Sequence, residues 1–303
     1  MSRALLEFLA GVVPEENIRQ QEPMSEHTTF RVGGPAEVFV TVDDSEQLGK
    51  VIRYLNLTGW PHFLLGNGSN LLVGDKGYRG VVIRLGRGFE NVKTEGNRLT
   101  CGAAVSLARA AKTAMENGLA GLEFASGIPG SVGGGVRMNA GAYGGELGNL
   151  VESVLVMAKD ASLMELDNET MEFGYRKSVL KDRPYAVLQV TLRLQEGGRE
   201  EILSRMNEFA ARRRQKQPLE YASAGSTFKR PEGHFAGKLI MDAGLRGMRI
   251  GGARVSDKHC GFIINDGTAT AADIAELIRE VSETVKEKFG VRLEPEVIFL
   301  GDF

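Results

Sequence analysis

The chain has 303 residues, 42% of them hydrophobic, so it is long enough for two or three domains with a substantial core. Lys and Arg total 37 and Asp and Glu total 39, and the net charge of −2 gives no reason to expect nucleic acid or an anionic membrane as a partner. The two cysteines, Cys101 and Cys260, lie far apart, which argues against a disulfide framework and a zinc site.

The N-terminal residues 4–13 are apolar but few, and Glu15 and Glu16 follow them. This pattern predicts an amphipathic helix and not a secretory signal. No apolar stretch approaches the roughly 20 residues that a membrane-spanning helix requires. We therefore expect a cytoplasmic protein with no membrane partner.

The next residues predict a small α+β unit. Residues 36–42 alternate like a strand, and Ser45 is expected to cap a helix with one apolar face. Residues 61–65 and 80–85 read as two further strands.

A second unit begins with a strand at residues 98–102 and a helix that stops at Gly118. Strands are expected at residues 151–158 and 186–194, with a weaker candidate at 163–166. A helix over residues 200–211 leads to a basic boundary at 212–218.

The last third is expected to form its own domain. Thr270 and Asp273 form a capping pair for a helix that ends at Gly290. The chain thus predicts an α+β protein in four parts: an N-terminal helical segment at residues 1–30, two α+β subdomains at about 31–90 and 91–195, and a C-terminal α+β domain at 205–303.

Residues 119–146 are unusually rich in glycine. An interior glycine costs about 0.5–1 kcal/mol relative to alanine, so such density suits a backbone that must approach a ligand such as a diphosphate. A flexible loop is the alternative, but the segment also carries apolar residues that favour burial: Leu122, Phe124, Ile128, Val132, Val136 and Met138.

Two glycine-rich loops are candidates for holding one diphosphate. Gly66–Asn70 follows a strand, and its backbone amides could form an anion-binding nest, as could those of 126–134. Neither loop matches a P-loop or the Rossmann fingerprint. The candidate cofactor-binding residues, including two further along the segment, are Gly66, Asn67, Gly68, Ser69, Asn70, Ser126, Gly127, Ile128, Pro129, Gly130, Gly133, Gly134, Asn139 and Gly141.

Three positions are candidates for chemistry. Arg176 lies in Phe-Gly-Tyr-Arg-Lys-Ser, where a packed aromatic corner would fix a guanidinium suited to a carboxylate or developing enolate, although a surface arginine fits equally well. Ser226 lacks the nucleophile-elbow pattern of hydrolases and could instead form a turn or cap. Glu296 precedes an apolar terminal strand, but Glu294 points to the same face and spacing does not choose between them.

Together these residues resemble the UDP-N-acetylmuramate dehydrogenase family, also called the UDP-N-acetylenolpyruvoylglucosamine reductase (MurB) family, in its compact type. The likeness runs from His27 to Phe303. Besides the glycine-rich segment, it depends on motifs at His27–Gly34, Leu65–Leu72, Met138–Tyr143, Tyr175–Arg176, Ala224–Ser226 and Pro295–Val297.

The resemblance implies non-covalent FAD in a domain of the vanillyl-alcohol-oxidase/PCMH type over residues 31–195. It also implies a C-terminal domain that closes over the substrate. The implied activity is an oxidoreductase of peptidoglycan precursor synthesis, and therefore of cell-wall growth and division. It would reduce UDP-N-acetylglucosamine-enolpyruvate to UDP-N-acetylmuramate, with NADPH as the reductant.

The resemblance also implies roles for individual residues. Reduced flavin N5 would deliver hydride to C3 of the enolpyruvyl group, with Arg176 and a protonated Glu296 stabilising the enediolate and Ser226 protonating C2. Substrate contacts carry over to Tyr143, Tyr175, Lys216 and Lys229. The register of the basic contacts at 212–216 stays open, and Arg230 replaces a common Asn.

Two other interpretations remain. One is a different flavin oxidase of the same superfamily that acts on an alcohol or sugar, against which the motif at residues 251–255 argues. The other is a nucleotide-binding module without catalysis, against which the joint presence of Arg176, Ser226 and Glu296 argues.

Overall fold

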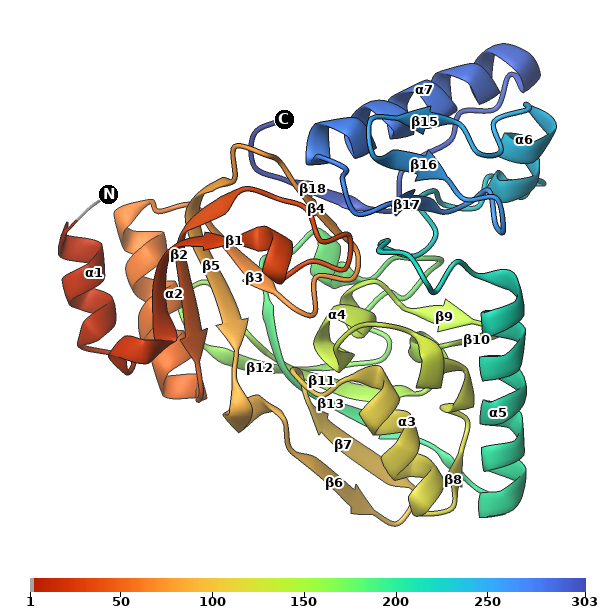
Figure 1. Cartoon of the computed structure of the whole chain (residues 1–303). Helices are drawn as coiled ribbons and strands as arrows, with labels where there is room; N and C mark the ends of the chain where they lie inside the picture. Colours follow the sequence, from red (N-terminus) through yellow and green to blue (C-terminus); the bar gives the residue numbers. More distant parts are fainter. Residues whose placement is uncertain (1–2) are drawn as a thin grey trace. The chain divides into compact units, whose positions relative to one another are not determined.

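The computed structural model describes residues 3–303 (Figure 1). Contacts divide the chain into two compact units, each built from separated stretches. Unit 1 contains the chain up to Arg19, Val38–Gly66 and Gly80–Arg212, and unit 2 contains Gln20–Glu37, Asn67–Arg79 and Arg213–Phe303. Two early segments therefore group with the C-terminal residues. The domain limits read from the sequence remain predictions.

Two helices lie near the N-terminus. Helix α1 (Arg3–Ala10) buries Leu5 and Leu9 and is shorter than the sequence suggested. Helix α2 (Ser45–Thr58) is capped by Asp44, whose side chain accepts a hydrogen bond from the Gln47 amide at 2.8 Å. The prediction of Ser45 as the cap is wrong by one residue, because the extended backbone conformation of a cap occurs at Asp44.

A four-stranded sheet has the order β1-β2-β5-β3. The three predicted strands are confirmed as β2 (Pro35–Val42), β3 (His62–Leu65) and β5 (Tyr78–Leu85), and β3 pairs in parallel with β5. Strand β1 (Ile18–Pro23) was not predicted, because its residues are polar and mostly exposed. Since β3 ends at Leu65, the first glycine-rich loop starts directly at a strand end.

A five-stranded antiparallel sheet forms the second layer of unit 1, in the order β12-β11-β13-β7-β6. It confirms all four strands expected in this region. Strand β6 was missed because it is short and half exposed. The bounds are β6 (Val92–Glu95), β7 (Arg98–Gly102), β11 (Val151–Met157), β12 (Leu163–Asp167) and β13 (Ala186–Arg193).

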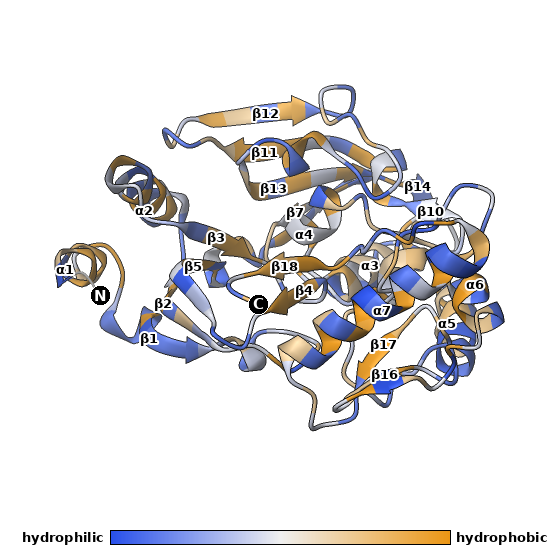
Figure 2. Ribbon diagram, turned by 90° about the horizontal axis from the view of Figure 1, so that it is seen from above, coloured by the Kyte–Doolittle hydropathy of each residue, from blue (hydrophilic) through white to orange (hydrophobic). Residues whose placement is uncertain are grey.

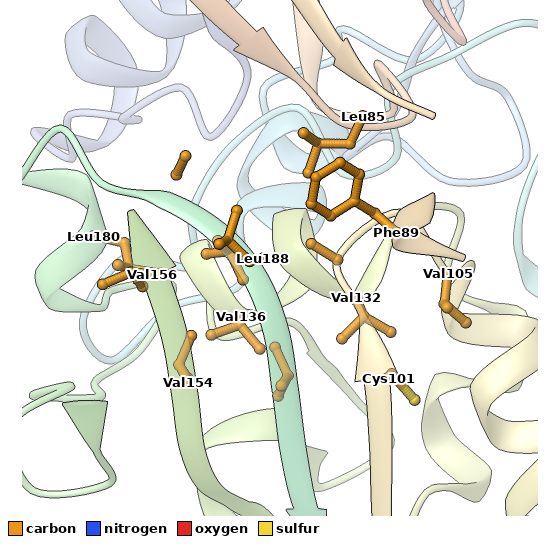
Figure 3. Packing of buried hydrophobic residues seen from close by; sticks show 14 of the residues in the cluster. Leu85, Phe89, Cys101, Val105, Val132, Val136, Val154, Val156, Leu180 and Leu188 are labelled. Carbon is orange, nitrogen blue, oxygen red and sulfur yellow. The ribbon is translucent and has the colours of Figure 1, made fainter. Parts of the chain in front are cut away.

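The glycine-rich segment contains a short buried helix, α4 (Val132–Arg137), which contacts α3 (Leu107–Glu116), β7 and β13. Figure 3 shows Val132 and Val136 of α4 within the apolar cluster that also contains Leu188. The segment is therefore part of the packed core, and the flexible-loop alternative is wrong.

The remaining short elements of the first 200 residues complete these layers. Strands β8 (Leu119–Ala120) and β14 (Gln195–Glu196) pair with each other, and β9 (Gly141–Ala142) pairs with β10 (Gly145–Glu146). Six 3₁₀ turns occur at Glu15–Asn17, Met24–Glu26, Arg87–Phe89, Glu123–Gly127 (η4), Leu147–Asn149 and Val179–Lys181 (η6).

Both cysteines are free and buried, as the sequence suggested. Burial raises the pKa of the Cys101 thiol to about 12, so this thiol stays protonated in the core.

Helix α5 (Arg199–Lys216) extends beyond the predicted residues 200–211. Arg, Gln and Lys are good helix formers, so the basic run that was read as a boundary continues the helix, and Pro218 follows its end. Ion pairs four residues apart, Glu201–Arg205 and Glu208–Arg212, lie along its exposed side.

Unit 2 packs α7 (Ala271–Phe289) against α6 (Ala236–Asp242) and a three-stranded sheet of β15 (Arg249–Ile250), β16 (Ala253–Val255) and β17 (Ile263–Asn265). The predicted capping box and the glycine end of α7 are confirmed. Figure 2 shows apolar and polar residues alternating along α7, as expected for a helix with one buried face.

Distant segments of unit 2 are joined by a parallel strand pair and a carboxylate. Strand β18 (Ile298–Leu300) pairs with β4 (Leu71–Val73). The two carboxylate oxygens of Asp75 accept hydrogen bonds from the Ala271 and Ala272 amides at 2.8 and 2.9 Å, at the first turn of α7. Within residues 3–303, no helix is both long and apolar enough to cross a membrane.

We predict that Asp75→Ala lowers the free energy of unfolding by about 1–2 kcal/mol, because it leaves two amides of the α7 N-terminus without their acceptor. Urea denaturation followed by circular dichroism measures this change. Glu276→Ala on the same helix, which removes only an exposed pairing with Arg279, is the control and should leave stability unchanged. Equal effects of the two substitutions would contradict the capping role of Asp75.

Candidate active site

The first glycine-rich loop presents free backbone amides. Gly68 has φ +60°, and a Cβ there would lie 1.9 Å from the carbonyl oxygen of His27, so only glycine fits. Among the described residues 3–303, no protein group accepts a hydrogen bond from the amides of Asn67, Gly68 or Ser69. Gly66 and Asn67 are exposed. Such a run of unpaired amides suits an anionic ligand.

The second loop approaches the first at one point. Ser131 caps α4 by accepting a hydrogen bond from the Gly134 amide at 3.2 Å. A Cβ on Gly66 would lie 2.9 Å from the Ser131 hydroxyl. Within the part of the chain that the structure describes, the amides of Gly130 and Ser131 also donate to no protein group. Each of these two runs of unpaired amides is suited to an anionic ligand.

The Ser126 hydroxyl already has a protein partner. It donates to the carbonyl of Glu123 at 2.8 Å, at the start of η4. Glu123 is itself buried, accepts from the Gly121 amide at 2.7 Å and lies 3.6 Å from the Arg205 guanidinium of α5. The η4 turn that leads to Gly127–Gly130 is therefore held by its own hydrogen bonds and by the ion pair with α5.

Neighbouring glycines of α4 have different surroundings. A Cβ on Gly133 would lie 2.9 Å from the Ala103 Cβ, so this glycine is required for close packing. Gly134 is exposed, and a Cβ there would meet only the Ser131 hydroxyl, at 3.3 Å. Of the two, only Gly134 is exposed and free of close packing.

Tyr143 lies at the tip of the β9–β10 hairpin. Tyr143 and Gly144 have φ of +53° and +86°, the signs that a type I′ turn requires. The Tyr143 ring stacks on Phe209 of α5, with centroids 4.6 Å apart, and remains 41% exposed. One face of the ring is thus covered by α5.

The Arg176 guanidinium is held by backbone carbonyls. It donates to the carbonyl of Gly141 at 2.9 Å and to that of Asn139 at 3.5 Å. Its Cζ lies 5.2 Å from the ring centroid of Tyr175, which is 54% exposed. The guanidinium is thus held by two carbonyl oxygens and lies near the Tyr175 ring.

Two residues that sequence reasoning missed support this region. The Ser178 hydroxyl donates to the Arg137 carbonyl at 2.8 Å, and the Arg137 guanidinium donates to the carbonyl of Leu180. Burial lowers the pKa of Arg137, and the nearby Asp182 opposes that shift. The signal that could have identified Arg137 in the sequence is the presence of an arginine within a glycine-rich, apolar segment.

In unit 2, backbone pairing brings Ser226 close to Glu296. The Glu296 amide donates to the Thr227 carbonyl at 2.8 Å, and Ser226 precedes Thr227 in the chain. The Ser226 hydroxyl is exposed and donates to the carbonyl of Phe228 at 3.2 Å. The side chain of Asn70, from the first loop, donates to the Glu296 carbonyl at 3.0 Å.

The choice between Glu294 and Glu296 follows from their surroundings. The Glu294 carboxylate pairs with Lys229 and is 68% exposed, whereas Glu296 is partly buried. Lys229 is therefore already neutralised in this structure, while Lys216 is exposed at the end of α5.

His259 was not singled out from the sequence, yet it lies beside Ser226. Its Nδ1 accepts a hydrogen bond from the Gly261 amide at 3.1 Å, so the neutral ring carries its proton on Nε2. A Cβ on Gly261 would lie 2.9 Å from His259 Cε1 and 3.6 Å from the Ser226 hydroxyl. Burial, and then the charge of Lys216, lower the pKa of His259 and favour the neutral ring.

Comparisons with known proteins decide the family. Residues 36–167 match an FAD binding domain, and residues 217–300 match the C-terminal domain of UDP-N-acetylenolpyruvoylglucosamine reductase. The reductase of that name from Lachnoclostridium phytofermentans is 48% identical over 306 residues, which cover 100% of this chain and 99% of its own. The chain belongs to the UDP-N-acetylenolpyruvoylglucosamine reductase family. The Clostridioides difficile reductase is 49% identical over 294 residues, with 97% of each chain covered.

Solved structures agree with this family. The reductase from Thermus caldophilus is 40% identical with a TM-score of 0.82, covering 94% of this chain and all of its own. The grass pollen allergen Phl p 4, a glucose dehydrogenase, is only 12% identical with a TM-score of 0.51 over 64% of this chain and 44% of its own, which shows a shared fold alone.

These findings confirm the predicted family, the α+β fold with an FAD-binding domain, and FAD as the cofactor of an oxidoreductase. The sugar-oxidase and non-catalytic interpretations are set aside by the full-length match to the reductase family.

We predict opposite outcomes for two adjacent alanine substitutions. Gly133→Ala should lower the stability of the apoprotein by about 1–3 kcal/mol, because the new methyl group overpacks α4 against Ala103. Gly134→Ala should leave the apoprotein melting temperature unchanged and weaken FAD binding at least about tenfold, because its methyl group faces the open side of the loop. Thermal denaturation of the apoprotein and FAD titration measure the two effects. A Gly134→Ala protein that binds FAD normally would contradict the proposed contact.

Proposed function

We propose that this protein reduces UDP-N-acetylglucosamine-enolpyruvate to UDP-N-acetylmuramate, with NADPH as the reductant. The observation that carries this proposal is the 48% identity to a named reductase across the whole chain. FAD, when bound, would supply the hydride chemistry that links NADPH to C3 of the enolpyruvyl group.

The two glycine-rich loops would hold the FAD diphosphate. Their unpaired amides at residues 67–69 and 130–131 supply neutral donors, so they bind an anion with no need for lysine or arginine. Gly134 leaves room for the ligand to approach α4.

Arg176 would bind the carboxylate of the substrate. Hydride addition at C3 moves negative charge onto this carboxylate, so a fixed cation stabilises the intermediate more than the ground state. The carbonyls of Asn139 and Gly141 orient the guanidinium in advance, which reduces the reorganisation needed during the reaction.

Ser226 would donate the proton that C2 receives. Its hydroxyl is exposed and bonded only weakly, at 3.2 Å, to a backbone carbonyl, so it can turn toward a ligand. The backbone amide of Glu296 donates to the carbonyl of Thr227, the residue after Ser226, and Glu296 would assist Arg176 as a protonated acid. Protonation at C2 completes the net addition of two hydrogens.

Substrate recognition would use the side chains that surround these groups. Tyr143 and Tyr175 expose aromatic rings suited to the nucleotide and sugar, and Lys216 exposes an ammonium group suited to the diphosphate. Lys229 would exchange Glu294 for a substrate phosphate. We place the reaction in the cytoplasm, where both NADPH and nucleotide-linked sugars are available, with no nucleic acid or membrane involved.

We predict that the purified holoenzyme oxidises NADPH under nitrogen only when UDP-N-acetylglucosamine-enolpyruvate is present. The product should be heavier by two hydrogens, as mass spectrometry measures. UDP-N-acetylglucosamine, which lacks the enolpyruvyl group, is the control and should not support oxidation. Rapid NADPH oxidation driven by oxygen alone would instead indicate a flavin oxidase.

We predict that Ser226→Ala slows reoxidation of the reduced flavin by the substrate at least about 100-fold, as expected for loss of a positioned acid. Reduction of the flavin by NADPH should be unchanged, because that step delivers no proton to C2. Anaerobic stopped-flow absorbance measures the two half-reactions separately, and Ser223→Ala is the matched control. An equal loss in both half-reactions would rule out the assigned role.

A further inference from the structure

Asn139 was expected to contact the cofactor, but it lies entirely inside unit 1. Its exposed fraction is 0%, and each of its polar groups has a protein partner. Its backbone amide donates to the Val136 carbonyl at 3.1 Å, and its backbone carbonyl accepts from the Arg176 guanidinium at 3.5 Å. Its Oδ1 accepts from the Gly148 amide at 2.8 Å, and its Nδ2 donates to the Gly174 carbonyl at 2.9 Å. No part of Asn139 is available to line a ligand site.

The partners of Asn139 are the segments that carry Arg176. Gly174 begins the turn that ends at Lys177, and two backbone hydrogen bonds of 3.0 Å close that turn around Tyr175 and Arg176. Asn139 therefore holds the first residue of the turn with its side chain and the guanidinium with its own carbonyl.

The Oδ1 atom of Asn139 supports the Gly174–Lys177 turn indirectly. Gly148, which Asn139 binds, lies against Phe173, since a Cβ on Gly148 would be 2.8 Å from the Phe173 Cβ. The Asn139 side chain thus contacts two backbone groups near Phe173, the residue before the turn. These are the Gly148 amide and the Gly174 carbonyl.

Backbone conformation adds to this argument. Asn139 and Arg176 both have positive φ, +43° and +53°. Asparagine tolerates the left-handed region because its short amide can bond locally, whereas arginine does so at a cost. A strained turn at Arg176 persists only where neighbouring groups hold it, and Asn139 supplies two of those contacts.

We propose that Asn139 is a positioning residue for Arg176 and not a contact to the cofactor. It fixes the Gly174–Lys177 turn so that the guanidinium is presented to the carboxylate of the ligand. This inference rests on the proposed function, because it takes Arg176 as the group that binds the substrate carboxylate.

A pair of ligands separates this role from a general structural one. UDP-N-acetylglucosamine-enolpyruvate carries the carboxylate, and UDP-N-acetylglucosamine lacks it. Asn139→Gly, which keeps the positive φ accessible and removes the amide, should raise the Kd of the first ligand about tenfold and leave that of the second unchanged. Titration of the oxidised holoenzyme, followed by the flavin absorbance or by calorimetry, measures both constants without turnover.

Asn56→Ala is the control. The Asn56 side chain also makes a long-range hydrogen bond to backbone within unit 1, to the Lys159 carbonyl at 3.0 Å, but none to the Arg176 turn or to Gly148. It should leave both Kd values unchanged. If Asn139→Gly does not fold, Asn139→Asp serves in its place, because it keeps the acceptor for Gly148 and removes only the donor to Gly174.

A double-mutant cycle completes the test. Arg176→Ala alone should weaken binding of the carboxylate ligand, and adding Asn139→Gly should weaken it no further, because Asn139 acts through Arg176. FAD content should equal that of the wild-type protein in every variant.

The outcomes are distinct. A wild-type protein that binds both ligands equally and does not reduce the enolpyruvyl compound would overturn the proposed function. A functional wild-type enzyme with unchanged binding in Asn139→Gly, additive effects in the double mutant, or FAD loss in the Asn139 variants alone would overturn the positioning role.

Discussion

The close approach of α4 to the sheet is the constraint on which unit 1 depends. A Cβ on Gly133 would lie 2.9 Å from the Ala103 Cβ, so the helix can occupy this position only with glycine there, and a Cβ on Gly135 would lie 2.9 Å from the Cδ1 of Leu147, which would have to shift. Because α4 is buried there, its N-terminal residue Ser131 meets the loop at Gly66, and its C-terminal end leads directly into Asn139. Packing of one short helix therefore positions Ser131 beside Gly66 and places Asn139, which supports Arg176.

Much of the fold could be predicted from apolar periodicity and capping. Strands at 36–42 and 186–194 and the capped helix after Thr270 appear in the structure because their buried residues recur at the spacing of a strand or helix. The polar strand β1 had no such pattern. The division into units could not be read either, since Gln20–Glu37 and Asn67–Arg79 join the C-terminal residues through long-range contacts. Contacts between residues far apart in the chain leave no local sequence pattern from which they could be predicted.

For the candidate site, the sequence indicated candidate residues but could not give the surroundings of each one. Glycine density indicated close backbone approach, but it did not distinguish Gly133, which is required for packing, from Gly134, which is open. Spacing could not choose between Glu294 and Glu296, because the ion pair that engages Glu294 comes from Lys229, 65 residues away. His259 was missed for the same reason, as its proximity to Ser226 arises only from folding.

Backbone strain points to the same region by an independent route. Among residues 3–303, seven non-glycine residues have positive φ, and three of them, Asn139, Tyr143 and Arg176, belong to the candidate site. Each such conformation costs of order 1–3 kcal/mol and persists only where surrounding contacts hold it. Here hydrogen bonds from Arg176 to the carbonyls of Asn139 and Gly141 join two of the strained residues to each other. A looser turn with arginine in an ordinary conformation would cost less, but it would not hold the guanidinium in a fixed orientation. The strain is thus the energetic counterpart of the fixed arginine that we propose for substrate binding.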